Sequence, residues 1–154
     1  MSRIQQRIEE LGLRFPPPPK PVANYLPAVR TGSLIFVSGQ IPVLEGRLVA
    51  EGPVPSAVSV EAARGAARQC ALNGLAVIAA ELDGDLDRIR RIVRLGIFVA
   101  SDPGFNDQPV VANGASEVLI EIFGEPGRHA RAAVGSIALP LGATVEVEMV
   151  VEVG

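Results

Sequence analysis

The C-terminal segment alternates between apolar and acidic residues, which restricts the folds that the chain can adopt. Residues 144–153 read TVEVEMVVEV, a period of two that is typical of a β-strand. One face of this strand carries Val145, Val147, Met149, Val151 and Val153, and the other carries Glu146, Glu148 and Glu152. We therefore expect a sheet with one face on a hydrophobic core and a second face that is too acidic to join that core.

Strands and two helices are predicted along the rest of the chain. Ser59 is the expected N-cap of the first long helix, and Pro109 suits the first turn of the second. The Pro- and Gly-rich residues 41–58 are expected to lie irregularly over the surface. In order, we predict two short strands within 25–37 around a turn at Thr31-Gly32, a loop at 38–40, a helix over 59–82, a strand over 88–100, a helix from about 109, and strands over 131–138 and 144–153.

Small residues predict that both helices pack closely. A stripe of Ala63, Ala67, Cys70 and Gly74 gives the first helix a slim face that can lie close to a sheet. A glycine inside a helix costs about 1 kcal/mol relative to alanine. Gly114 in the second helix therefore indicates either close packing or a function at Asn113-Gly114.

This order of elements predicts an α+β domain with both helices on one face of a mainly antiparallel sheet. The opposite face would expose glutamates beside apolar and small residues. Such a face is awkward for a monomer and natural for subunits whose sheets pack together, so we expect a homo-oligomer with pockets between subunits.

The N-terminal residues form a separate segment in this interpretation. Ile4, Ile8 and Leu11 recur at helical spacing, and Gly12 can end that helix. Pro16 to Pro19 then predict a stiff polyproline spacer. We therefore divide the chain into an extension over residues 1–23 and a domain over residues 24–154.

Composition argues against several classes of partner. Fourteen basic and 17 acidic residues give a net charge of −3, and aromatic residues are only 4%, which disfavours nucleic acid as the main partner. The single Cys70 excludes an intramolecular disulfide and is expected to be a buried helix residue in a reducing compartment. No secretory segment or run of about 18 apolar residues is present, so we expect a cytoplasmic protein without a membrane span.

Arg131 is the main candidate for binding a ligand, because it is an isolated arginine among small and apolar residues. A guanidinium group holds a carboxylate through two parallel hydrogen bonds. Glu146 on the following strand can move protons if partial burial shifts its pKa. One His and one Cys cannot form a zinc site from nitrogen and sulfur ligands, and neither GxxxxGK[ST] nor GxGxxG occurs, so no metal or organic cofactor is expected.

Three motifs in order resemble the RidA (YjgF) family over roughly residues 24–153. They are the segment Ser38-Gly39-Gln40-Ile41-Pro42, Asn113 in the second helix, and the pattern Arg131, Leu139-Pro140 and Val145-Glu146-Val147-Glu148. The resemblance implies a chorismate-mutase-like fold, a homotrimer with sites between subunits, and hydrolysis of reactive 2-imino or enamine acids to 2-keto acids and ammonia. It further implies that Arg131 binds the substrate carboxylate, that Glu146 positions or activates water, and that Tyr25, Ser38, Gly39 and Asn113 line the pocket. Some relatives carry the name endoribonuclease L-PSP.

Two departures from the compact members leave the reaction open. Ala133 stands where many members have a cysteine in the pocket, and the N-terminal extension and the longer loop at 41–58 are additional. The alternatives are a non-catalytic trimer that binds small carboxylates through Arg131, and RNA cleavage, which the acidic balance disfavours.

Each candidate residue also has a purely structural alternative. Arg131 and Glu146 can be ion-paired surface residues, Tyr25 can simply pack, and Asn113 can simply cap backbone groups. Glu148 is assigned a structural role, and His129 is interpreted as a loop residue.

The strand register decides whether Arg131 and Glu146 share a face. If residues 131–138 pair antiparallel with 144–153, a slip of one residue moves Arg131 to the other face of the sheet. The sequence does not fix this parity.

Overall fold

A computed structural model describes residues 1–18, 20 and 24–154 of the chain. Its main sheet has five strands in the order β1-β2-β7-β5-β6, in which β5 and β6 are parallel and the other neighbours are antiparallel. A separate two-stranded hairpin joins β3 and β4. The strands are β1 (Ala28–Thr31), β2 (Leu34–Gln40), β3 (Val43–Leu44), β4 (Arg47–Leu48), β5 (Ile89–Ala100), β6 (Ala130–Ser136) and β7 (Val145–Val153).

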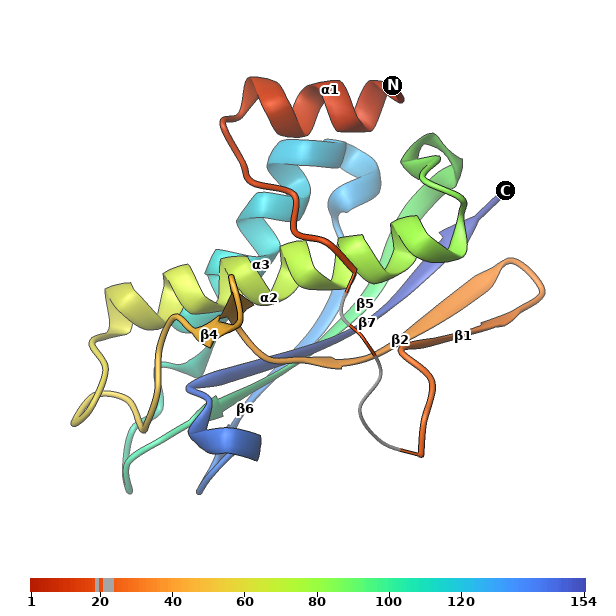
Figure 1. The fold of residues 1–154 in the computed structure, drawn as a ribbon. Coiled ribbons are helices and arrows are strands. Elements are labelled where there is room, and N and C mark those ends of the chain that lie inside the picture. Colours follow the sequence, from red (N-terminus) through yellow and green to blue (C-terminus); the bar gives the residue numbers. More distant parts are fainter. Residues whose placement is uncertain (19, 21–23) are drawn as a thin grey trace.

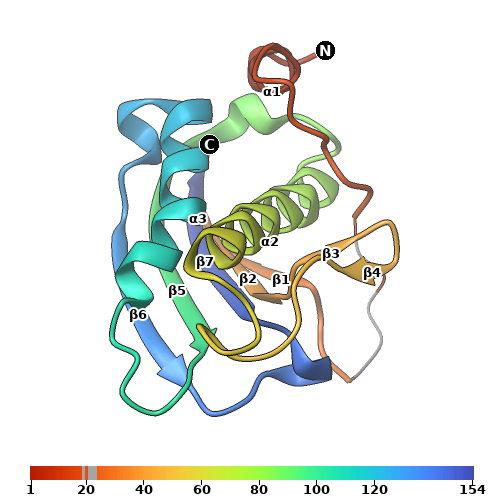
Figure 2. The ribbon, with the colours of Figure 1, turned by 90° about the vertical axis from the view of Figure 1, so that its left-hand side faces the viewer.

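Two long helices cover one face of the main sheet (Figures 1 and 2). Helix α2 (Val60–Glu81) packs on β7 and β2, and helix α3 (Gln108–Phe123) packs on β5, β6 and α2. The predicted α+β class, with helices on one face of a mixed and mainly antiparallel sheet, is therefore confirmed. Three 3₁₀ turns complete the fold: η1 (Leu86–Arg88), η2 (Glu125–Gly127) and η3 (Pro140–Gly142).

The core lies between the two helices and the sheet. The five apolar residues of strand β7 that face the helices are buried, whereas Val150 and the three glutamates lie on the opposite face and remain partly exposed. Cys70 is fully buried in α2, as predicted. Gly74 of α2 lies directly over the Met149 side chain, so a methyl group there would collide with it. The predicted small-residue face thus brings α2 close to β7.

The helix boundaries follow their local chemistry. The Ser59 side chain accepts a hydrogen bond from the Ala62 amide and caps α2, as predicted. Gly114 confirms the expectation of close packing, because a Cβ there would collide with the backbone carbonyl of Arg64 in α2. Helices α2 and α3 therefore approach until their backbones nearly touch.

Helix α1 (Arg3–Glu10) packs against the body of the protein rather than standing apart. Ser2 and Gln5 form a capping box, and the Asp87 carboxylate of η1 accepts hydrogen bonds from the Arg3 and Ile4 amides. Ile4 and Ile8 are buried in the core cluster.

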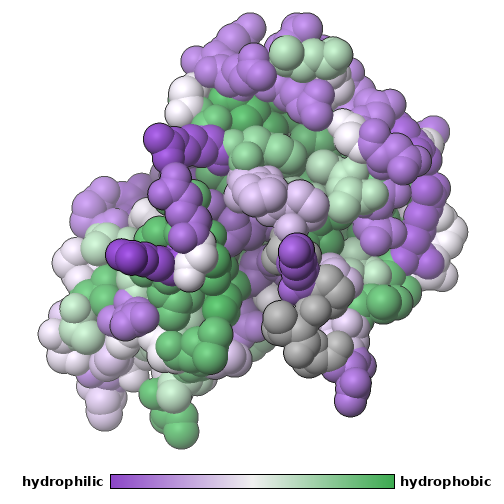
Figure 3. All heavy atoms as spheres, viewed as in Figure 1, coloured by the Kyte–Doolittle hydropathy of each residue, from purple (hydrophilic) through white to green (hydrophobic). Residues whose placement is uncertain are grey.

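In the space-filling view, hydrophilic residues dominate the upper and right-hand rim, and apolar residues gather nearer the middle and at the lower left (Figure 3). Pro19 of the predicted spacer and the proposed boundary at residue 23 lie outside the described residues.

Three expectations about connections are wrong. Ser38-Gly39-Gln40 is not a loop but the end of β2, where a bulge interrupts pairing with β7. Residues 41–58 are not wholly irregular, because they include the β3–β4 hairpin, held by hydrogen bonds from the Asn73 side chain to the carbonyls of Ile41 and Val43. Strand β6 pairs parallel with β5 and does not pair with β7. The reason is that α3 connects β5 to β6 as a crossover, which makes these two strands parallel neighbours.

Candidate functional site

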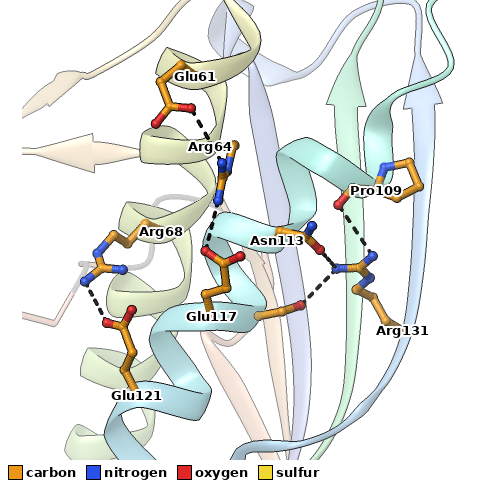
Figure 4. Close-up of polar contacts among 9 residues, drawn as sticks. Glu61, Arg64, Arg68, Pro109, Asn113, Glu117, Glu121 and Arg131 are labelled. Carbon is orange, nitrogen blue, oxygen red and sulfur yellow. Dashed lines mark hydrogen bonds and ion pairs between the residues drawn. The ribbon is translucent and has the colours of Figure 1, made fainter.

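Arg131 lies on the edge strand β6 and points to the helix side of the sheet. Its register partner is Leu95 of β5, whose side chain is fully buried in the core below the helices. The guanidinium group reaches α3, where Nη1 donates to Asn113 Oδ1 at 2.8 Å and to Ser116 Oγ at 3.1 Å, while Nη2 lies 3.5 Å from the Pro109 carbonyl (Figure 4). All three acceptors are uncharged, so these contacts hold the guanidinium group without neutralising it.

The packing of α3 on α2 sets where these acceptors lie. Gly114 lets α3 press against Arg64. Ion pairs of 3.0 Å join Arg64 to Glu117 and Arg68 to Glu121 across the two helices (Figure 4). These contacts fix the rotation of α3, and Asn113 and Ser116 are left on the side that meets Arg131.

Glu146 lies on the opposite face of the sheet. It alternates with the buried Val145 and Val147, and its carboxylate lies directly over Gly39, where a Cβ would collide with Oε1. Gly39 belongs to the bulge of β2, so the bulge and the missing side chain together make room for this carboxylate. Burial, and secondly the neighbouring Glu148, raise the pKa of Glu146 above its usual range.

Ser38 directly precedes Gly39 at the end of β2, and Tyr25 lies in the segment that leads into β1. The Ser38 hydroxyl donates to the Leu26 carbonyl at 2.7 Å and ties the loop that enters β1 to the end of β2. Tyr25, next to Leu26, is 55% exposed. Glu148 forms an ion pair with Arg94 at 3.4 Å, in keeping with its structural assignment.

The predicted site residues thus form two separate groups within one chain. Arg131 and Asn113 meet at the β6 edge, on the helix side, whereas Glu146 and Gly39 meet on the outer face, near Ser38. A single chain does not bring Arg131 and Glu146 into one cleft, because the core residues Leu95 and Met149 share the row of Arg131, whereas Glu146 points away from them. Any common site needs Arg131 and Glu146 from different subunits.

Two further residues lie close to Arg131: Ser116, which was not selected from the sequence, and His129, which lies between η2 and β6 and is a loop residue as predicted. Ser116 is buried, and its hydroxyl oxygen lies 2.9 Å from His129 Nε2, while His129 Nδ1 lies 2.7 Å from the Gly127 carbonyl. These residues, with Ile120 and Arg128, line a shallow hollow of about 200 Å³. The sequence spacing could have indicated Ser116, because it follows Asn113 by three residues and so lies on the same helix face.

Neither a metal site nor a membrane helix is found in the described part of the chain. Within residues 1–18, 20 and 24–154, no three His, Cys, Asp or Glu side chains are grouped so that they could hold a metal ion. None of the helices in these residues has the length and apolar character needed to cross a bilayer.

Comparison with known proteins identifies the family. Residues 5–153 match the family described as "YjgF/chorismate mutase-like, putative endoribonuclease". The chain belongs to the YjgF/chorismate mutase-like family. The match includes most of helix α1 as well as both groups of candidate residues, so the resemblance seen in three short motifs extends over nearly the whole YjgF-like chain.

Three relatives show how this YjgF-family chain compares with other members. Protein TCP17 of Trypanosoma cruzi is 42% identical over 98% of this chain and 94% of its own length. The crystal structure of Atu1372, a protein of unknown function from Agrobacterium tumefaciens, is 46% identical with a TM-score of 0.92, over 98% of this chain and 92% of that one. A 2-iminobutanoate/2-iminopropanoate deaminase of Dermatophagoides farinae is 31% identical over 86% of this chain and 88% of its own.

Proposed function

We propose that this protein hydrolyses small 2-imino or enamine acids to 2-keto acids and ammonia, at sites formed between the subunits of a homotrimer. The observation that carries the proposal is the state of Arg131. Its guanidinium group is exposed, positively charged and held by three neutral oxygens, which is the arrangement needed to receive a carboxylate. The likeness to a 2-iminobutanoate/2-iminopropanoate deaminase supports the choice of substrate class.

The outer face of the sheet supports an assembly. Val29 and Phe36 on β1 and β2, and Val134 on β6, are large apolar side chains that are about half exposed there. Burying such a face against a second copy is favourable by about 25 cal/mol per Å². The same contact would further bury Glu146 and would bring the outer face of one subunit towards the β6 edge of another.

The chemistry needs only these groups. Arg131 would bind and orient the substrate carboxylate. Glu146 of a neighbouring subunit would accept a proton from water while the water oxygen bonds to the imine carbon, and the C=N electron pair would move to nitrogen. Glu146 would then return the proton to that nitrogen, which gives a carbinolamine. Glu146 would next transfer the hydroxyl proton of the carbinolamine to the nitrogen, so that the C=O bond forms as the C–N bond breaks and ammonia leaves. A carboxyl group with a raised pKa is suited to both proton transfers.

The test is ammonia and keto-acid release from freshly generated 2-iminobutanoate. We expect the wild type to exceed the buffer rate and Arg131→Ala to lose most of this acceleration, because truncation removes the carboxylate anchor. Arg14→Ala is the matched control, since it removes an exposed guanidinium group that pairs with Glu45 at 2.9 Å, outside the hollow that Arg131 lines. All proteins are first compared by light scattering, where the trimer has three times the 16.1 kDa chain mass.

A different result would favour the second candidate, a non-catalytic carboxylate-binding trimer. In that case, 2-ketobutyrate would bind and Arg131→Ala would abolish binding, while wild type would release ammonia no faster than buffer. The neutral acceptors around Arg131 favour anion binding in either case.

A further inference from the structure

Arg131 is held at the end of a chain of hydrogen bonds that begins at the backbone. The chain runs from the Gly127 carbonyl to His129 Nδ1 (2.7 Å), from His129 Nε2 to Ser116 Oγ (2.9 Å), and from Ser116 Oγ to Arg131 Nη1 (3.1 Å). It connects turn η2, helix α3 and strand β6. A Cβ on Gly127 would collide with the Leu119 carbonyl, so the turn is pressed against α3 and the carbonyl has a fixed place.

The Gly127 carbonyl determines which group is the donor and which the acceptor in every hydrogen bond of this series. A carbonyl oxygen only accepts, so His129 Nδ1 must carry a hydrogen. In a neutral imidazole Nε2 is then an acceptor, and the Ser116 hydroxyl must donate to it. The lone pairs of Ser116 Oγ are thereby left to accept from Arg131 Nη1.

Protonation of His129 disturbs this arrangement. Nε2 would become a donor to Ser116 Oγ, so the two lone pairs of that oxygen would be shared between Nε2 and Arg131 Nη1, and the serine hydrogen would lose its acceptor. The imidazolium charge would also repel the nearby Arg131 guanidinium group. The charged groups close to the imidazole are Arg131, Arg128 and, paired with Arg128, Glu125, whereas α3 presents the neutral Ser116 and Ile120. Burial, and then the Arg131 charge, lower the pKa of His129 despite the Gly127 hydrogen bond, so the neutral form dominates at pH 7.

We propose that Ser116 and His129 are positioning residues for the Arg131 guanidinium group, and that protonation of His129 loosens this hold, by reversing the Ser116–His129 hydrogen bond and by repelling the guanidinium group, and so weakens carboxylate binding. This inference rests on the proposed role of Arg131 as the carboxylate anchor. Neither residue touches the substrate in this scheme. Ser116 restricts one nitrogen of the guanidinium group, and His129 orients the hydroxyl that does so.

The first experiment measures binding of 2-ketobutyrate by calorimetry from about pH 5 to 8, the range in which a histidine titrates. Ser116→Ala is expected to weaken binding about 2- to 10-fold at pH 7.5, because one of the hydrogen bonds that position the guanidinium group is lost. Wild-type affinity should fall as the pH drops below 6.5, the ordinary histidine value, and His129→Gln should remove that fall because its amide does not titrate. Glu146 is present in both proteins, so its own titration cancels in the comparison.

Two controls separate positioning from a general structural effect. Ser116→Thr keeps the hydroxyl group and should restore most of the affinity lost in Ser116→Ala. Ser136→Ala removes a hydroxyl group from β6, the strand that carries Arg131; this hydroxyl donates to the Ala138 carbonyl, and the variant should bind as wild type. Affinities of Ser116→Ala and His129→Gln that equal wild type at every pH would overturn the proposal.

A second measurement needs no variant and no ligand. Nitrogen-15 NMR of the wild-type imidazole should show the hydrogen on Nδ1 at pH 7.5, and a hydrogen mainly on Nε2 would overturn the proposal. If wild type binds 2-ketobutyrate but releases no ammonia, the deaminase function fails while the positioning proposal is still decided by these binding and NMR results. If Arg131→Ala binds as wild type, the anchor and the positioning proposal fail together.

Discussion

The protonation of Glu146 is controlled by where the sheet places it. Its carboxylate lies half-buried over Gly39, and Glu148 is the next outward residue of β7. Both effects disfavour the charged form and raise its pKa. A group whose pKa is raised on folding stabilises the fold at low pH, and this contribution is lost as the pH rises through the folded-state pKa. The site therefore keeps a carboxylate at neutral pH at some cost in stability.

The first prediction concerns Glu148→Gln. Removing the neighbouring charge should lower the pKa of Glu146, so the acidic limb of the kcat/KM profile should move to lower pH while activity at pH 8 is kept. The shift should be incomplete, because burial is the larger cause and remains. The measurement is kcat/KM for 2-iminobutanoate against pH, with buffer hydrolysis subtracted.

Glu152→Gln is the matched control, since it removes an outward glutamate from the same strand, six residues from Glu146. The acidic limb of its kcat/KM profile should coincide with that of wild type. If the acidic limb is unchanged in Glu146→Gln, a group other than Glu146 controls the pH dependence of kcat/KM.

At the scale of elements, the contact between α2 and α3 depends on one missing methyl group. A helix interior normally favours alanine over glycine by about 1 kcal/mol. At residue 114 a Cβ would collide with the Arg64 carbonyl, which belongs to the backbone and cannot rotate away. Gly114→Ala should therefore destabilise the protein by about 1–3 kcal/mol, the usual cost of overpacking, as measured by urea unfolding.

Gly65→Ala provides the control for this second prediction. Residue 65 is also a helical glycine, but a Cβ there meets no atom within 4 Å, so propensity alone should act and the variant should be as stable as wild type or more so. Equal effects of the two substitutions would contradict the packing argument. A displaced α3 should also weaken 2-ketobutyrate binding, because Asn113 and Ser116 move with it.

Local patterns were enough to predict the two long helices and the strands β5, β6 and β7, but they did not predict which strands pair. The alternation over 144–153, the Ser59 cap and Pro109 each reflect chemistry within a few residues, and the structure confirms them. The pairing of β6 with β5 depends on the crossover through α3, which no local signal records. The bulge at Ser38-Gly39 makes sense only beside the Glu146 carboxylate, a contact over 100 residues long in sequence.

The candidate site was predictable residue by residue but not as an arrangement. Arg131 and Asn113 were selected from motifs, and they do form a hydrogen bond of 2.8 Å. Which face each residue occupies followed only from the register, which separates Arg131 from Glu146. The contact between Ser116 and His129 was not predicted, because it requires the turn η2 to fold back against α3.

At the scale of the whole molecule, this separation means that the proposed active site requires more than one subunit. Arg131 lies at the β6 edge on the helix side, and Glu146 lies on the outer face. If each site uses Arg131 of one subunit and Glu146 of the next, two inactive variants should complement one another. Arg131→Ala subunits still supply Glu146, and Glu146→Gln subunits still supply Arg131.

The third prediction is that mixed trimers of these two variants regain activity. With equal amounts and random assembly, roughly one interface in four joins an intact Arg131 to an intact Glu146, so activity should return to about a quarter of wild type. The measurement is ammonia release after the two variants are unfolded together and refolded, with mass spectrometry of differently tagged chains to confirm exchange. The same variants mixed without unfolding provide the control and should stay inactive while subunits do not exchange. If the chains are shown to mix and activity is not regained, sites between subunits are contradicted. A single chain holds Arg131 and Glu146 on opposite faces of its sheet, so these two residues could not share a site in any other way.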